Sequence, residues 1–357
     1  MKLHAFLAGL ASIACLSAVP AQADPPASQP ITGGQGVANF LGPIETTNQR
    51  PYQLLFLAFP PESANVLTDG RRSTALKLDI GYDFLNPSPV FGAVVKEETE
   101  TERFEYRETY GLGKGWEASA SIPIMWRNAG FLGLLVGPYH DLIHFNDPTI
   151  DAYQGRGTAA LFHSTVYDEQ LNGSVSVNEG PAVGLGDTSL FLKKAVWSTG
   201  HTALAARAAV KVPTGNDAEL IGSGGFDEGV DVDFSQEINR KIALHGGWNR
   251  VWMQRDPYLP NNAPTAAGYL AALEIHPRSK ESWLIQGEGG ETTYRTGNSF
   301  ADGAPRIAGV GYKWTPKPDT TWTLGFTQGG DYQTFHWPGV SNIGPDFTIT
   351  ADMVKTR

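Results

Sequence analysis

The sequence predicts an all-β fold, an antiparallel transmembrane β-barrel of about twelve strands. Apolar and polar residues alternate with a period of two over many segments of about ten residues. The connections between these segments alternate between short and long. The 357-residue chain is rich in glycine (41 residues), and only 18% of its residues are charged. Outer-membrane barrels combine these features, because one face of each strand meets lipid and the other meets the lumen.

Residues 1–23 read as a signal peptide. Lys2 supplies a positive start, an apolar run follows, and Ala21-Gln22-Ala23 forms an A-x-A cleavage site. The single cysteine, Cys15, lies in this leader, so we expect a mature chain without disulfides or thiol chemistry. Export without disulfides favours the outer membrane of a Gram-negative bacterium.

The next two segments precede the barrel. Residues 24–37 are rich in proline, glycine and serine, which predicts a mobile N-terminus. Residues 38–73 form an apolar N-terminal segment with two alternatives, packing inside the lumen or forming a first irregular strand. We expect the barrel itself over residues 74–357.

The clearest strand covers residues 116–127. Its even positions are apolar from Trp116 to Trp126, and its odd positions are mainly polar. Ten residues at about 3.3 Å each, tilted near 45°, span roughly 23 Å, which is close to the height of an outer-membrane apolar belt. Trp116 and Trp126 therefore fit the two aromatic girdles, and Trp314 and Trp322 on later strands are further candidates.

The alternation of apolar and polar residues with a period of two predicts eleven more strands. The predicted twelve are residues 74–86, 100–111, 116–127, 186–197, 202–213, 229–240, 241–253, 265–277, 281–295, 305–315, 320–331 and 346–355. An even number returns both chain ends to the periplasmic side. The insertion at residues 128–185 holds further apolar segments, so a fourteen-strand barrel is the alternative.

Residues 202–213 are ambiguous in isolation, because their alanines favour a helix. A short turn before them and a long loop after them favour a strand instead. In that register Ala208 faces lipid, and Arg207 and Lys211 face the lumen. We expect a charge at position 208 to impair assembly, and Arg207→Ala to alter the lumen and leave the fold largely intact.

Charged side chains on the inner parity are predicted to line the lumen. They are Lys77, Asp79, Asp83, Arg103, Glu105, Arg107, Glu117, Arg207, Lys211, Asp231, Asp233, Glu237 and Lys313. Both signs occur, which differs from the one-sign rings that select ions. Two roles stay open for them, ion pairs that close the interior or a narrow polar path for a solute.

The chain shows no pattern for catalysis, a metal or a cofactor. His140 and His144 nearly match a zinc motif, but aspartate replaces its glutamate and a third ligand is missing, so we expect no metal site. There is no G-x-S-x-G elbow, which leaves a lipid hydrolase as the weaker alternative. The formal net charge of −10 and the lack of a basic cluster argue against nucleic-acid partners.

Two acidic groups, residues 96–102 and 226–233, lie where long loops enter strands. Their simplest role is solvated loop charge. The alternative is divalent cations that bridge to lipopolysaccharide phosphates, since carboxylates suit calcium and magnesium. Expected partners are outer-membrane lipid, lipopolysaccharide, the barrel-assembly machinery and a small solute.

Five segments together resemble an uncharacterised family of proteobacterial outer-membrane proteins, defined only by a domain of unknown function. The segments are residues 42–57 (GPIETTNQRPYQLLFL), 110–124 (YGLGKGWEASASIPI), 139–145 (YHDLIHF), 184–193 (GLGDTSLFLK) and 211–215 (KVPTG). The last two are also similar to barrels linked to uptake of aromatic and fatty compounds. The resemblance implies an outer-membrane barrel and no catalytic residues. One departure is the ending ADMVKTR, which lacks the terminal aromatic residue that assists assembly of many barrels.

These observations lead to one main expectation about function. We expect a monomeric barrel that passes a small, hydrophobic solute. The main alternative is a barrel that transports no solute and has a structural or lipid-organising role in the envelope.

Overall fold

The computed structural model describes residues 40–85, 95–128, 130–133, 135, 165–168, 181–254, 262–293, 304–329 and 347–357. The expected signal peptide and mobile N-terminus lie outside these residues. So do His140 and His144. Within the described part, no helix has the length and apolar character needed to cross a membrane.

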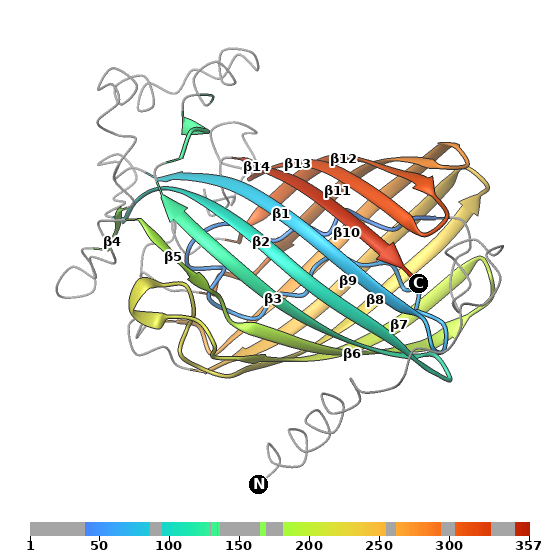
Figure 1. Ribbon diagram of the computed structural model, residues 1–357, viewed down its shortest axis with the longest axis horizontal. Coiled ribbons are helices and arrows are strands. Elements are labelled where there is room, and N and C mark those ends of the chain that lie inside the picture. The colour runs from blue at the N-terminus through green and yellow to red at the C-terminus, as the bar shows by residue number, and fades with distance from the viewer. Residues whose placement is uncertain are drawn as a thin grey trace, which may run out of the picture.

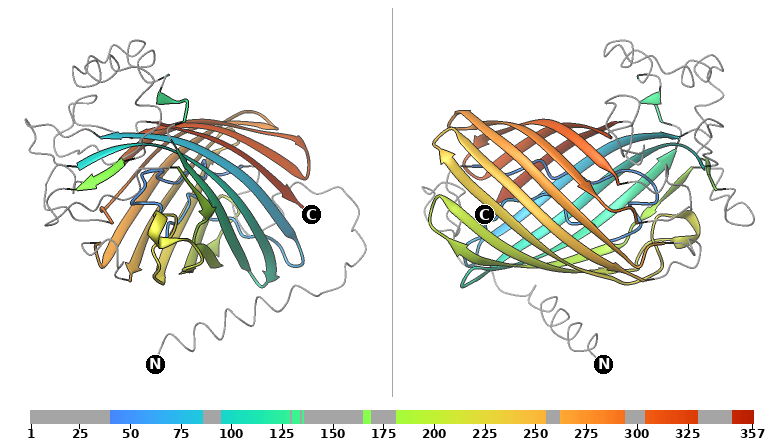
Figure 2. Two further views of the ribbon diagram at one scale, coloured as in Figure 1. Left: turned by 60° about the vertical axis from the view of Figure 1, so that its left-hand side comes forward. Right: turned by 180° about the vertical axis from the view of Figure 1, so that it is seen from behind.

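Twelve antiparallel strands form a closed barrel (Figures 1 and 2), so the predicted fold class is confirmed. The strands are β1 (Arg72–Leu85), β2 (Val95–Gly113), β3 (Trp116–Asn128), β6 (Thr188–Ser198), β7 (Thr202–Val212), β8 (Asp227–Asn239), β9 (Ile242–Met253), β10 (Thr265–Arg278), β11 (Glu281–Gly290), β12 (Arg306–Lys317), β13 (Thr320–Gly329) and β14 (Phe347–Thr356). Each pairs with its neighbours, and β14 pairs with β1 to close the ring. Closure leaves no long strand with an unpaired edge in lipid.

Two short strands explain why fourteen was a reasonable alternative. β4 (Thr165–Asp168) and β5 (Ala182–Leu185) pair with the ends of β2 and β3 and take no part in closing the ring. β5 and β6 both pair with β3 and are separated opposite Pro123, which has no N–H for the ladder. Gly186 donates its N–H to the Pro123 carbonyl at 2.8 Å.

The two ends of the barrel differ. Tight turns join β2 to β3, β6 to β7, β8 to β9, β10 to β11 and β12 to β13 at one end, which we call the short-turn end. The longer connections lie at the opposite, long-loop end. The start of β1 and the end of the chain meet at the short-turn end, where Arg72 and Arg357 exchange backbone hydrogen bonds of 2.9 and 2.7 Å.

The strands place apolar side chains outward and charged side chains inward. Trp126, Ile285 and Val310 expose more than half of their surface on the outer face. In water such a belt would be an aggregation surface, whereas in the outer membrane it contacts lipid. On β7, Ala205, Arg207 and Ala209 are buried inside, so the ambiguous segment is a strand with period two.

Ala208 tests this register. It lies on the outer face between Leu192 of β6 and Val230 of β8. Ala208→Arg should destabilise the folded barrel by about 2–4 kcal/mol, because it places a charge in the apolar belt. Urea unfolding in phospholipid vesicles measures this, with Ala208→Leu as the matched control. Equal stability of the two variants would mean that position 208 does not face lipid.

Candidate functional site

An inner segment, residues 40–71, occupies the lumen (blue in Figure 1). It enters at the short-turn end, where the rings of Phe40 and His276 lie 5.5 Å apart. It turns over residues 51–55, where Lys211 Nζ donates to the Leu55 carbonyl at 2.7 Å, and then returns to β1. The segment has turns but no helix or strand, so its backbone needs hydrogen-bond partners from elsewhere.

Charged side chains of the wall supply many of these partners. Glu274 of β10 accepts the N–H groups of Leu41 and Gly42 at 2.8 and 2.9 Å. Lys313 of β12 donates to the carbonyls of Leu41 and Pro43 at 3.2 and 2.7 Å. Near the long-loop end, Asp227 accepts the Leu57 N–H at 2.9 Å. The inner charges therefore satisfy the backbone of the inner segment.

Glycines let the segment approach the wall closely. A β carbon at Gly311 would lie 2.4 Å from Ile44 Cδ1, and one at Gly81 would lie 2.4 Å from Gln49 Cβ. Both distances are too short for non-bonded carbons. These two positions have no room for a side chain while the segment is in place.

Glu62 of the inner segment joins three strands. Its Oε1 lies 2.9 Å from Arg107 Nη1 of β2 and 3.2 Å from Arg207 Nη1 of β7. Its Oε2 lies 3.1 Å from Lys193 Nζ of β6. Burial opposes ionisation, but the charges of Arg207, Lys193 and Arg107 outweigh it and lower the pKa of Glu62 to about 2. The three cations therefore favour the carboxylate form of Glu62.

The cations around Glu62 have further partners. Arg207 Nε lies 2.8 Å from Asp231 and 3.0 Å from Asp233, both on β8. Arg107 Nη1 lies 2.8 Å from Glu45, the second carboxylate that the inner segment contributes. We call Glu45, Glu62, Arg107, Lys193, Arg207, Asp231 and Asp233 the central charge cluster.

Two smaller groups flank the central charge cluster. Lys77 lies 3.3 Å from Asp79, and Arg103 lies 2.5 Å from Glu105. Near the long-loop end, Lys211 lies 2.6 Å from Asp187 and 3.2 Å from Asp227. Buried charges of both signs are thus paired along single strands and between neighbouring elements of the wall.

The structure places eleven of the thirteen predicted lumen residues against the inner segment or in these groups. They are Lys77, Asp79, Arg103, Glu105, Arg107, Glu117, Arg207, Lys211, Asp231, Asp233 and Lys313, all with side chains buried or nearly so. Asp83 of β1 is buried as well. Glu237 lies at the short-turn rim instead, where it pairs with exposed His201 at 3.3 Å.

Several lumen residues escaped the sequence analysis. Lys193 shares the inward parity of Phe191, so counting alternate positions along β6 could have found it. Glu45 and Glu62 had no such signal, because the inner segment has no period. Glu274 lies in the predicted strand 265–277, but nothing in the sequence links it to Leu41, more than 200 residues away.

Glu274 also belongs to a hydrogen-bonded network that resembles a catalytic triad. Ser235 Oγ lies 2.8 Å from His245 Nδ1, and His245 Nε2 lies 3.0 Å from Glu274 Oε2. However, Ser235 is fully buried and accepts the Ala64 N–H at 3.0 Å. The network fastens the inner segment and presents no open nucleophile.

The four girdle candidates point outward. Trp126 is at the long-loop end of β3 and is 55% exposed. Trp116, Trp314 and Trp322 lie near the short-turn end, where the last two stack with their ring centroids 6.0 Å apart. Aromatic rings at both ends of the apolar belt are typical of outer-membrane barrels.

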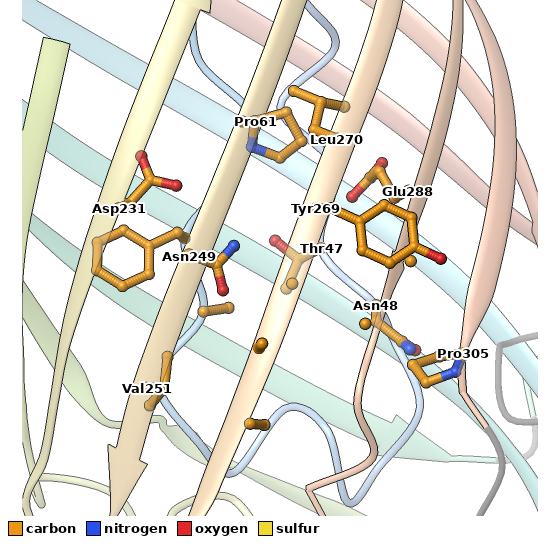
Figure 3. Close-up of a pocket in the computed structure, with 18 of the residues that line it drawn as sticks. Thr47, Asn48, Pro61, Asp231, Asn249, Val251, Tyr269, Leu270, Glu288 and Pro305 are labelled. Carbon is orange, nitrogen blue, oxygen red and sulfur yellow. The ribbon is translucent and has the colours of Figure 1, made fainter.

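A cavity of about 150 Å³ remains between the inner segment and the wall formed by β8 to β12 (Figure 3). It extends from Pro305 and Thr293 at the long-loop end to Arg207 and Leu270 deeper in the barrel. Its lining combines carboxylates with apolar groups. The carboxylates are Asp231, Asp233, Glu288 and Glu291, and the larger apolar groups include Leu57, Phe59, Val251, Leu270 and Ile307.

Comparison with solved structures supports the fold. The COG4313 outer membrane channel from Pseudomonas putida F1 matches with a TM-score of 0.56 and 11% identity, covering 84% of this chain and 100% of that chain. The NanC porin matches with a TM-score of 0.43 and 10% identity (78% and 98% covered). The toluene transporter TbuX of Ralstonia pickettii matches with a TM-score of 0.39 and 9% identity (92% and 98% covered). The match with a TM-score of 0.56 shows that the fold is that of a Gram-negative outer-membrane barrel.

A family match covers most of the chain. The family described as "Protein of unknown function (DUF3187)" matches residues 35–325, which confirms the resemblance inferred from the sequence. No curated protein matches the chain.

The central charge cluster makes a direct prediction. Glu62→Gln should loosen the inner segment, because three cations lose their shared carboxylate. Amides such as those of Leu57 and Ala64 should exchange hydrogen at least about tenfold faster in detergent micelles, as followed by mass spectrometry. Glu281→Gln, at the start of β11 and away from the cluster, is the control. Unchanged exchange in the Glu62 variant would show that packing alone holds the segment.

Proposed function

Since this chain belongs to the family described as "Protein of unknown function (DUF3187)", which assigns no activity, we propose its function from the structure: passage of a small, hydrophobic solute across the outer membrane. The cavity of about 150 Å³ at the long-loop end carries the proposal. It offers a small molecule a partly apolar site in a lumen that the inner segment otherwise fills.

The volume of the cavity limits the solute. An apolar cavity of about 150 Å³ in another protein accommodates benzene. The cavity here is similar in size and is lined in part by Leu57, Val251 and Ile307. A benzene-sized body therefore fits, whereas a folded peptide or a long sugar chain does not.

Passage beyond the cavity requires the inner segment to move. Thr46, Thr47 and Phe59 of the segment line the cavity, and the segment fills the lumen beside it. The segment is held by side chains and ion pairs and contributes no strand to the barrel, so it can shift without breaking the ladder. We propose that it is the gate.

The filled lumen also favours a second function, a barrel that transports nothing and serves the envelope structurally. In that case the inner segment is a permanent plug, and the charges on the wall exist to hold it. The two functions differ in one respect, whether the segment moves while the barrel remains folded.

A reversible cross-link separates them. Ala64→Cys with Ser235→Cys places two thiols where Ala64 N now lies 3.0 Å from Ser235 Oγ. Cells that carry the wild-type barrel should take up radiolabelled benzyl alcohol several-fold faster than cells without it. The oxidised double variant should fall to the background rate and recover with reductant, and each single-cysteine variant should be indifferent to oxidant.

Two results would contradict the proposal. If wild-type cells take up benzyl alcohol no faster than cells without the barrel, the structural function stands. If the oxidised double variant transports at the wild-type rate, the inner segment is not the gate.

A further inference from the structure

We propose that the cavity selects small amphipathic cations, molecules with an ammonium head on a benzene-sized apolar body, and that Glu288 of β11 binds the head. This inference rests on the proposed function, because it names the solute class for the same cavity. It comes from Glu288, the cavity carboxylate that forms no salt bridge among the described residues.

Glu288 has hydrogen bonds on one oxygen only. Gln286 Nε2 donates to its Oε1 at 2.8 Å, and the Thr46 hydroxyl donates to the same oxygen. Within the described ranges, no hydrogen bond reaches Oε2, and no lysine, arginine or histidine lies within 4.0 Å of either oxygen. Oε2 is therefore available to a ligand that carries donors.

The other carboxylates of the cavity already have cations. Asp231 and Asp233 pair with Arg207 at 2.8 and 3.0 Å. Glu291 at the rim lies 3.8 Å from Arg250. Glu288 is thus the acidic group of the cavity with which a cationic solute could form an ion pair.

The charge of the whole lining points the same way. Among the described lining residues there are four carboxylates and one guanidinium, that of Arg207. Arg207 already forms ion pairs with Glu62, Asp231 and Asp233, so the described lining has no unpaired cation that could bind an anionic solute. A carboxylate ligand would meet a lining of net negative charge, whereas an ammonium ion would be attracted.

The apolar body has a place directly beside the carboxylate. Leu270 of β10 is the cross-strand partner of Glu288, and both side chains line the cavity (Figure 3). The Cβ atoms of such cross-strand partners lie about 5 Å apart, so one molecule of the size of benzylamine can contact both side chains. Carboxylate and apolar surface are therefore spaced for one small molecule.

Three ligands with the same ring test the proposal, namely benzylamine, benzyl alcohol and benzoate. Isothermal titration calorimetry on the purified full-length barrel should show benzylamine binding roughly tenfold or more tightly than benzyl alcohol, and benzoate not binding. Glu288→Gln should reduce benzylamine to the affinity of benzyl alcohol. Glu281→Gln, the same change on the same strand outside the cavity, should leave all three affinities unchanged.

The results of these binding experiments can be distinguished from those of the uptake experiment that tests the proposed function. Benzyl alcohol uptake tests transport and does not depend on Glu288. Equal binding of the three ligands to the wild-type barrel, or benzylamine binding unchanged in the Glu288 variant, would overturn the selectivity and leave transport intact. If the Glu288 variant fails to show the gel mobility of a folded barrel, the ranking of ligands on the wild-type protein still decides.

Discussion

The carboxylate of Glu62, shared by Arg107, Lys193 and Arg207, is the interaction on which the rest of the lumen depends. Three strands place cations in an interior with little water, where an unpaired charge is costly. The inner segment has the opposite need, since its backbone forms no ladder of its own. The inner segment therefore supplies the counter-charge that the cations of the wall need. The wall supplies the hydrogen-bond partners that the backbone of the segment needs.

This pairing of wall and segment explains how a closed barrel of twelve strands could contain the movable segment that we propose. The ladder between strands is continuous, and the inner segment extends it only beside β1, where Gly70 and Arg71 make backbone hydrogen bonds to Gly111 of β2. The segment is attached through side chains such as Glu274 and Lys313, whose hydrogen bonds water can replace when it shifts. A gate of this kind needs no rearrangement of the sheet, which the bilayer would oppose.

The sequence predicted the parts that follow a period. The twelve strands, their inward charges and the outward tryptophans all come from alternation, and the strand boundaries differ from the expected ones mostly by a few residues, as in β7 and β3. The route of the inner segment, the position of Glu62 and the cavity at Glu288 were beyond sequence reasoning. They depend on contacts such as Leu41 with Glu274, which no local pattern encodes. The two alternatives for residues 38–73 could be separated only by the contacts that those residues make.

The central claim is that the inner segment moves inside a folded barrel. Spin labels at Ala58, on the part of the segment near the long-loop end, and at Arg240, on the turn between β8 and β9, report its position by pulsed electron resonance in lipid bilayers. The account predicts two distance populations, with the balance between them shifted when benzylamine is added. A single population that no solute shifts would contradict it and identify residues 40–71 as a fixed plug.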